Sequence, residues 1–177
     1  IALIKTKPMK KILFLFFMSI SLSQAQTAPA LDFFCELKVK LNPALVVGET
    51  PHGTRRIIPI VGGTVEGPKI KGEILNGGAD WQVLRQDGVM ELEAHYQFRT
   101  DDGTLIYVKN TGLRAATPEV AAKLARGEKV DASEYYFRAV PKFEAPKGKY
   151  DWINNSLFVC TGERLPDAVL IRVWKVL

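Results

Sequence analysis

Histidine and cysteine are both scarce in this sequence, with two of each among 177 residues. A zinc site needs several such ligands at short spacings, and the chain has neither a Cys-x-x-Cys pair nor a His-Glu-x-x-His run. It also lacks the Gly-x-Ser-x-Gly elbow that presents a nucleophilic serine. The glycine-rich run 62–67 is followed by Pro68 and a β-type segment, whereas a phosphate-binding loop opens a helix. We therefore predict turn and bulge glycines there, and no metal site.

The sequence also lacks a large net charge of either sign once the first eleven residues are left out. The formal charge is +5, but four of the 24 basic residues are lysines within the first eleven residues, where no acid occurs. The 20 basic residues that remain nearly balance 19 acidic residues, which leaves about +1. A nearly neutral domain does not attract nucleic acid or anionic lipid in general, so neither is an expected partner.

The longest apolar run, residues 12–20, is too short to cross a bilayer, which takes about 20 apolar residues. It follows Met9-Lys10-Lys11 and precedes the small residues of Ser23-Gln24-Ala25, as in a secretory signal peptide. We predict an upstream extension at 1–8, a signal peptide at 9–25 and one mature domain at 31–177. Cleavage is expected after Ala25, with Ala28-Pro29-Ala30 as a second site. The mature protein would be periplasmic or secreted, without stable membrane insertion.

Export changes the expectations for cysteines and cofactors. In an oxidising compartment Cys35 and Cys160, near the two ends of the mature chain, could form a disulfide. The alternative is two buried thiols that pack as small hydrophobic side chains. Since ATP and nicotinamide cofactors are scarce outside the cytoplasm, we expect no cofactor.

The mature region is dominated by alternating apolar and polar residues, which is the pattern of half-buried strands. Turn signals recur every eight to twelve residues, and a single helix is indicated by Thr117-Pro118-Glu119 at its start and Gly127 at its end. The pattern predicts a mostly β protein, a single antiparallel barrel or sandwich with one short helix. Strands are expected at 31–41, 55–61, 64–66, 70–75, 81–85, 90–99, 104–110, 134–140, 157–161 and 168–176.

Several polar and aromatic residues could form a site. Gly77-Gly78 could deliver Asp80 and Trp81 to a barrel mouth, although a tight turn with Trp81 in the core fits as well. A cavity-facing Arg138, on one strand face with Tyr136, would bind an oxyanion, while on the surface it would pair with an acid. The segment 150–155, which includes Trp152 and Asn154, would line a site or plug one barrel end.

Acid–base chemistry has three candidates. His95 shares the polar face of the strand 90–99 with Glu93, Gln97 and Arg99. Such a face usually meets solvent, but in a polar cavity His95 would be the natural acid–base group, because histidine titrates near neutral pH. Asp80 and Glu144 are the alternatives, if burial raises the pKa of either carboxyl.

The chain resembles the bacterial and fungal family known as domain of unknown function 3237, which includes proteins labelled UPF0311. The resemblance rests on an ordered series of motifs from about Phe33 to Val176, and two features differ from it: the export signal and histidine at position 95, where arginine is more frequent. It implies a compact lipocalin-like, up-and-down barrel with the helix packed at one side, and it does not point to any particular activity. The motifs are Gly62-Gly63-Thr64, Gly67-Pro68, Gly72-Glu73, Gly77 to Trp81, Thr100 to Gly103, Ile106-Tyr107, Tyr135 to Arg138, Phe143-Glu144, Tyr150 and Trp152-Ile153-Asn154.

Three functional hypotheses follow. The first is a barrel that binds a small apolar or aromatic molecule, with stacking from Trp81, Tyr107, Tyr136 and Trp152 and orientation from Asp80, Arg138 and Asn154. The second is a cofactor-free lyase, isomerase or hydrolase, in which Arg138 holds an oxyanion and Asp80, His95 or Glu144 moves a proton. The third is a structural or interaction module. The sequence leaves enzymatic activity open and indicates no oligomeric state.

Overall fold

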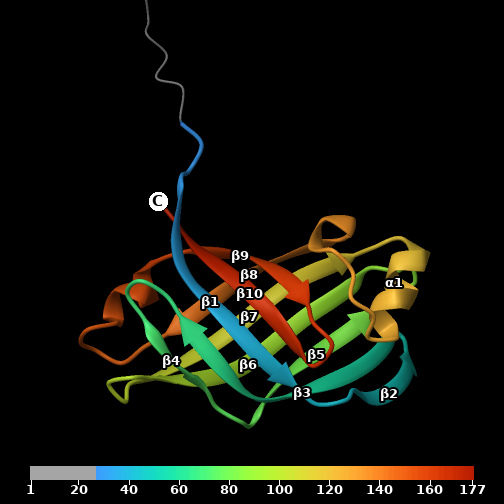
Figure 1. The fold of residues 1–177 in the computed structure, drawn as a ribbon, viewed down its shortest axis with the longest axis horizontal. Helices are drawn as coiled ribbons and strands as arrows, with labels where there is room; N and C mark the ends of the chain where they lie inside the picture. Colours follow the sequence, from blue (N-terminus) through green and yellow to red (C-terminus); the bar gives the residue numbers. More distant parts are fainter. Residues whose placement is uncertain (1–26) are drawn as a thin grey trace, which may run out of the picture.

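The computed structural model describes residues 27–177, so the predicted upstream extension and signal peptide lie outside the described part. The described chain folds into a closed, antiparallel, eight-stranded barrel with a single α-helix (Figure 1). This confirms the predicted fold class. The strands are β1 (Leu31–Leu41), β2 (Leu45–Thr50), β3 (Gly53–Glu66), β4 (Lys71–Ile74), β5 (Gly78–Leu84), β6 (Met90–Thr100), β7 (Leu105–Ala115), β8 (Tyr136–Glu144), β9 (Phe158–Arg164) and β10 (Ala168–Val176).

Ten strands fill eight barrel positions because two positions hold an interrupted strand. β4 and β5 both pair with β3 and β6 and run in the same direction, separated by residues 75–77. β1 and β2 likewise follow one another along β3, separated by residues 42–44. The remaining strands pair in chain order, and β1 closes the barrel between β10 and β3. The result is the up-and-down order expected from the sequence.

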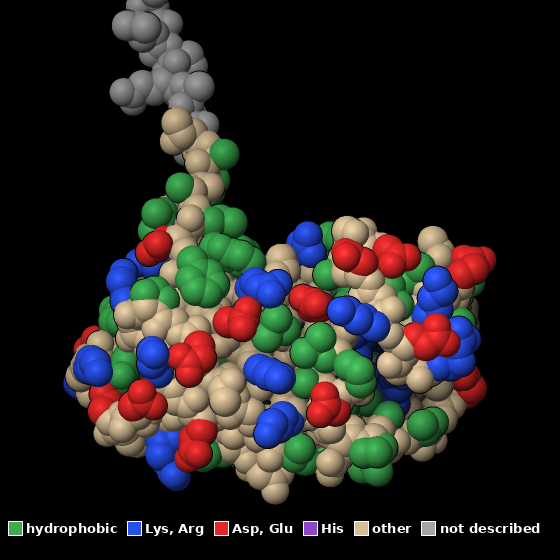
Figure 2. All heavy atoms as spheres, viewed as in Figure 1, with side chains coloured by type: hydrophobic (Ala, Val, Ile, Leu, Met, Phe, Trp, Pro, Cys, Tyr) green, Lys and Arg blue, Asp and Glu red, His purple; other side chains and the backbone are tan. Residues whose placement is uncertain are grey.

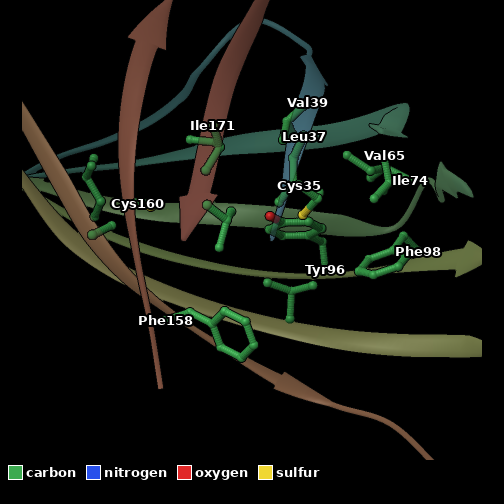
Figure 3. Close-up of a cluster of buried hydrophobic side chains, with 14 of the residues drawn as sticks. Cys35, Leu37, Val39, Val65, Ile74, Tyr96, Phe98, Phe158, Cys160 and Ile171 are labelled. Carbon is green, nitrogen blue, oxygen red and sulfur yellow. The ribbon is translucent and has the colours of Figure 1, made fainter. Parts of the chain in front are cut away.

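One end of the barrel is filled by aromatic side chains. Phe34, Phe143 and Phe158 pack against one another with ring centroids 4.9 to 5.5 Å apart, and Phe98 adds an edge contact to Phe143. All four rings are almost completely buried. Figure 3 shows Phe98 and Phe158 in the barrel interior with the aliphatic side chains of β1, β3 and β10. The barrel is therefore a packed core at this end.

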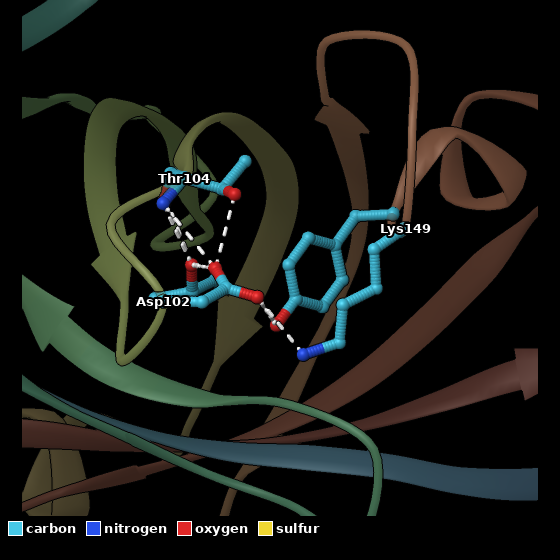
Figure 4. A network of polar contacts seen from close by, with 5 residues as sticks. Asp102, Thr104 and Lys149 are labelled. Atoms are coloured by element: carbon cyan, nitrogen blue, oxygen red, sulfur yellow. Dashed lines mark hydrogen bonds and ion pairs between the residues drawn. The ribbon is translucent and has the colours of Figure 1, made fainter.

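A polar clamp closes the same end. Asp102, in the β6–β7 turn, accepts hydrogen bonds from the Thr100 hydroxyl (2.5 Å), the Lys149 ammonium (2.9 Å) and the Tyr150 hydroxyl (3.1 Å) (Figure 4). These contacts join the hairpin to the loop that carries the short 3₁₀-helix η2 (Asp151–Asn155). They also hold the pKa of Asp102 well below its ordinary value.

The opposite end carries the helix α1 (Pro118–Ala125) (Figure 1). The Thr117 hydroxyl caps it by accepting a hydrogen bond from the Val120 N–H at 3.4 Å, and Pro118 begins its first turn, as the sequence predicts. Val120 and Leu124 are its buried side chains. A second 3₁₀-helix, η1 (Ala132–Glu134), leads from the helix back to β8. Within the described residues, no helix is both long and apolar enough to cross a membrane.

The surface carries both charges. Figure 2 shows acidic and basic side chains interspersed on the visible face, with apolar side chains gathered where β1 leaves the barrel. Exposed Leu31 and Phe33 belong to that strand, and Phe33 meets Trp174 edge to face.

Several boundaries differ from the prediction. The expected strands 55–61 and 64–66 are one strand, β3, because Gly62 and Gly63 take positive φ within it. A Cβ on Gly63 would lie 2.0 Å from the Lys38 carbonyl oxygen of β1, so only glycine fits this approach. β2, η1 and η2 were not expected, and β7 extends to Ala115 instead of ending at residue 110.

The structure has Cys35 and Cys160 as free, buried thiols and not as a disulfide. Burial raises the pKa of both thiols, that of Cys160 to about 12. The alternative of two buried thiols therefore describes this structure.

Candidate functional site

A cavity of about 430 Å³ opens at the helix end of the barrel. Its walls come from the ends of β1, β3, β5, β6, β7 and β9 and from α1, and its rim includes the loops at 42–44 and 166–167. Apolar side chains and a group of charged or polar side chains share the lining. The polar group consists of Arg56, Gln82, Arg114, Arg164, Asn42 and Asp167.

Three arginines from three separate strands converge on this cavity: Arg56 on β3, Arg114 on β7 and Arg164 on β9. None of the three forms an ion pair within 4.0 Å among residues 27–177. Burial and the repulsion from the neighbouring arginines lower the pKa of Arg114 to about 10. The same two causes lower the pKa of Arg56, and burial lowers that of Arg164. The cavity thus concentrates three positive charges, none of which has a carboxylate within ion-pair distance among the described residues.

A chain of hydrogen bonds connects Arg56 to the partly buried acid Asp80. Arg56 Nε donates to Gln82 Oε1 at 2.9 Å, and Gln82 Nε2 donates to Asp80 Oδ2 at 2.6 Å. The backbone N–H of Glu93 donates to Asp80 Oδ1 at 3.0 Å. The chain fixes the rotamers of Gln82 and Asp80, and therefore fixes the acid at the inner edge of the cavity.

The Asp80 carboxyl is balanced between opposing influences. Burial raises its pKa, while the hydrogen bonds from Gln82 and Glu93 and the charges of Arg114 and Arg56 lower it, and the net direction is upward. A carboxyl with a raised pKa stays protonated up to a pH nearer to neutral, and a general acid must carry its proton at the working pH.

Of the three predicted acid–base residues, only Asp80 faces the barrel interior. His95 points outward from β6, where its ring contacts the Tyr107 hydroxyl (2.5 Å), the Glu93 carboxylate (3.1 Å) and the edge of Trp81. Trp81 and Tyr107 are correspondingly exposed. This placement corrects the expectation that His95, Trp81 and Tyr107 share a cavity with Asp80.

The other predicted residues also lie away from the helix-end cavity. Arg138 and Tyr136 are on the outer face of β8, where the guanidinium lies 5.4 Å from the centre of the Tyr136 ring. Glu144 is exposed and pairs with Lys142 at 3.6 Å. Trp152 and Asn154 belong to η2, at the filled end. Trp152 packs on Phe34, and Asn154 bonds both backbone groups of Ala145, so both have structural contacts there.

Sequence reasoning missed the three arginines, although a signal was present. The inward phase of β7 runs through Val108 and Asn110, and two more steps of two residues reach Arg114. A single step of two residues beyond Ile60 and Ile58 reaches Arg56, and a single step beyond Cys160 and Gly162 reaches Arg164. The expected strands 104–110 and 157–161 end before Arg114 and Arg164, whereas Arg56 lies inside the expected strand 55–61, where its inward phase had to be counted from Ile58 and Ile60.

Within residues 27–177 no group of three or more His, Cys, Asp or Glu side chains is arranged to hold a metal ion. In the described part of the chain, Asp80 is the one acid hydrogen-bonded within the polar chain that begins at Arg56.

Comparisons of sequence and of structure with known proteins identify the same group of relatives. The profile described as "Protein of unknown function (DUF3237)" matches residues 29–176. A UPF0311 protein of Clostridium acetobutylicum is 42% identical over 135 residues, which is 76% of this chain and 85% of that protein. The crystal structure of a conserved protein of unknown function from Rhodopseudomonas palustris is 40% identical and superposes with a TM-score of 0.81, covering 86% of this chain and 100% of that one.

A more distant relative has a named activity. A hydroalkoxylation enzyme of Penicillium herquei is 24% identical over 156 residues, which is 88% of this chain and 89% of that protein.

Proposed function

The chain belongs to the DUF3237 family, and we propose that its barrel binds a small organic anion at the helix end, with the acidic group among the arginines and the apolar body toward the interior. The supporting observation is the convergence of Arg56, Arg114 and Arg164 without an ion pair among the described residues. Buried like charges destabilise a fold, and a bound anion removes that penalty.

Arginine suits such a ligand because its planar guanidinium gives two parallel hydrogen bonds to a carboxylate. The other lining residues favour an apolar or aromatic body. Ile58, Leu84, Met90 and Leu124 are all aliphatic or thioether side chains, and a cavity of about 430 Å³ accommodates a ring with a short chain. A carboxylate, a phenolate or an enolate would present the matching oxyanion.

A matched pair of probes tests this proposal. We expect trans-cinnamate to raise the melting temperature and its neutral methyl ester to do so much less, because only the acid carries the oxyanion. Arg114→Gln should weaken cinnamate binding about 10- to 100-fold, as expected for the loss of one hydrogen bond to a charged group. Arg138→Gln, on the outer face, is the control and should bind as the wild type does. If a panel of ring and chain carboxylates and phenolates behaves no differently from their esters and ethers, the proposal is wrong.

Catalysis is the second candidate, and the raised pKa of Asp80 beside the cavity favours it. A protonated Asp80 could deliver its proton to a carbon of a bound alkene or enolate while the arginines hold the oxyanion. In an addition of a phenol O–H across a double bond, Asp80 would protonate one alkene carbon and the phenolate oxygen would form the C–O bond to the other carbon. The Asp80 carboxylate would then take a proton from solvent, which replaces the proton that the phenol lost to solvent when it bound as the phenolate. The relative from Penicillium herquei, named as a hydroalkoxylation enzyme, supports this reaction class.

Activity measurements with Asp80 variants separate the two candidates. A panel of alkenyl phenols would be followed for cyclised product in D₂O, where an enzymatic addition places one deuterium on carbon. Asp80→Asn should abolish turnover while anion binding persists, because the arginines are unchanged. Turnover that persists in Asp80→Asn would remove Asp80 from the mechanism.

We also propose that the protein acts outside the cytoplasm, as the sequence of residues 9–25 suggests. The mass of the protein recovered from the periplasm or medium should then correspond to a chain that begins at Gln26. Recovery of the uncleaved chain from the cytoplasm would contradict export.

A further inference from the structure

The barrel has a second, smaller cavity beneath the arginines. Its volume is about 40 Å³, and it is lined mainly by aliphatic side chains together with Asp80, Tyr96 and Asn110. Leu41 lines both cavities, and Asp80 of the inner one is hydrogen-bonded to Gln82 of the outer one. The Asp80–Gln82 pair therefore marks the boundary between the two.

Tyr96 is unusual among the polar residues of the interior. It is 2% exposed, and its hydroxyl is the one buried side-chain polar atom of residues 27–177 that lacks a hydrogen-bond partner. Figure 3 shows its ring in the barrel interior among the labelled apolar side chains. A buried hydroxyl without a partner is costly, and native proteins retain few of them.

Asn110 lies in the same inner cavity with weak partners. It is 7% exposed, and its amide contacts the Cys160 sulfur at 3.8 and 3.9 Å. Sulfur is a poor hydrogen-bond donor and acceptor. Two side chains that are more than nine-tenths buried and carry strong hydrogen-bonding groups thus line one small space.

The size of the inner cavity limits what can fill it. A single water needs about 10–15 Å³ by this measure, so the cavity holds a group of a few atoms and not a whole ligand. A larger molecule anchored in the outer cavity could place one end there. Asn110 and Arg114 are four residues apart on β7, about 13 Å along the strand. Once the length of the arginine side chain is allowed for, the remaining distance corresponds to one aromatic ring with a short chain.

We propose that the inner cavity is a subsite in which Tyr96 and Asn110 bind a neutral oxygen, a hydroxyl or a carbonyl, at the far end of the ligand. This deepens the proposed function and rests on it. The ligand class becomes a molecule with an oxyanion at one end, a ring or short apolar body, and a hydrogen-bonding oxygen at the other end. A ligand with an apolar far end would leave both polar side chains unpaired, and that difference is the basis of the selectivity.

The experiment compares trans-4-hydroxycinnamate with trans-cinnamate, which differ only in the far oxygen, by calorimetry on the wild type, Tyr96→Phe and Arg114→Gln. We expect the wild type to bind the hydroxylated acid about tenfold more tightly, and Tyr96→Phe to lose most of this preference, because only Asn110 then contacts the far oxygen, with the affinity for cinnamate unchanged. Arg114→Gln should weaken both acids by a similar factor and leave their ratio intact.

The outcomes separate the two proposals. If neither acid binds the wild type, the proposed function fails first. If both bind with equal affinity, or if the wild-type preference survives in Tyr96→Phe, the subsite is refuted and the anion site stands. Tyr96→Phe removes only a hydroxyl without a protein partner, so it should melt at or above the wild-type temperature. A lower melting temperature with no change in selectivity would indicate a buried water as the sole partner of Tyr96, which also refutes the subsite.

Discussion

Replacing Arg114 with methionine should stabilise the unliganded protein and weaken its ligand binding. The folded protein lowers the pKa of Arg114 to about 10, from an ordinary value of about 12.5. That difference corresponds to about 3 kcal/mol of penalty on the charged side chain in the fold. Methionine keeps much of the apolar stem and carries no charge, so most of this penalty should disappear.

We expect a gain of about 2 kcal/mol, which is about 4–8 °C in melting temperature for a domain of this size. The pH dependence follows from the direction of the shift. A base whose folded pKa is lowered is penalised fully below that pKa, and the penalty fades as the pH rises from about 10 toward the unfolded value. The difference between variant and wild type should therefore be constant from pH 6 to 9.

The assay is thermal unfolding at low ionic strength, with and without trans-cinnamate. Arg138→Met is the matched control, since Arg138 lies on the outer face of β8 and should change the melting temperature little. With cinnamate, the wild type should gain more than Arg114→Met. The reasoning is refuted if Arg114→Met melts below the wild type while the control does not, because Arg114 would then be a structural residue.

Three further predictions concern other buried or clamped groups. Burial raises the pKa of Asp80, so wild-type stability should fall as the pH rises from about 4 through the folded pKa, and Asp80→Asn should lack this slope in denaturant titrations at several pH values. Hydrogen bonds from Thr100 and Lys149 lower the pKa of Asp102, so Asp102→Asn should melt below the wild type at neutral pH, and the difference should shrink steadily as the pH falls from about 4 toward the lower folded pKa. A difference that does not shrink in this acid range would contradict the reasoning. Since burial raises the pKa of Cys35 and Cys160, both thiols should resist a thiol reagent in the native protein and react on unfolding, and a native mass lighter by two hydrogens would instead reveal a disulfide.

Local sequence patterns were sufficient for most of the fold. The alternation in 90–99 predicted β6 with its correct inward face, and Thr117-Pro118 predicted the start of α1. These signals lie within a few residues of the element they specify. β2 was missed because its residues show little alternation of apolar and polar side chains and are mostly exposed. Its strand conformation depends on pairing with β3, which its own sequence pattern does not reveal.

The site was harder to predict because it depends on which residues share the inside of a closed barrel. Asp80 was identified, but it was grouped with Arg138 and His95, which have the opposite phase on their strands. Those residues were selected because their side chains are reactive or charged. Which residues line the cavity depends instead on which side of each strand faces the barrel interior. Arg114 and Arg164 look like ordinary surface arginines until their strands are extended, and Arg56 does so until the inward phase is counted from Ile58 and Ile60.

The asymmetry of the barrel determines how a ligand reaches the interior. Phe34, Phe143 and Phe158 fill one end, and the Asp102 clamp closes it, so entry from that side would require disruption of the packed core. Entry at the helix end passes the three arginines before it reaches Asp80 and the inner cavity. A ligand entering here would therefore be selected first by its negative charge at the arginines, then by the size of its body in the outer cavity, and last by its far oxygen in the inner cavity. Because α1 and the loop at 42–44 frame this entrance, amide exchange in those two segments should slow when an anion is bound, while the strands at the aromatic end should be unaffected.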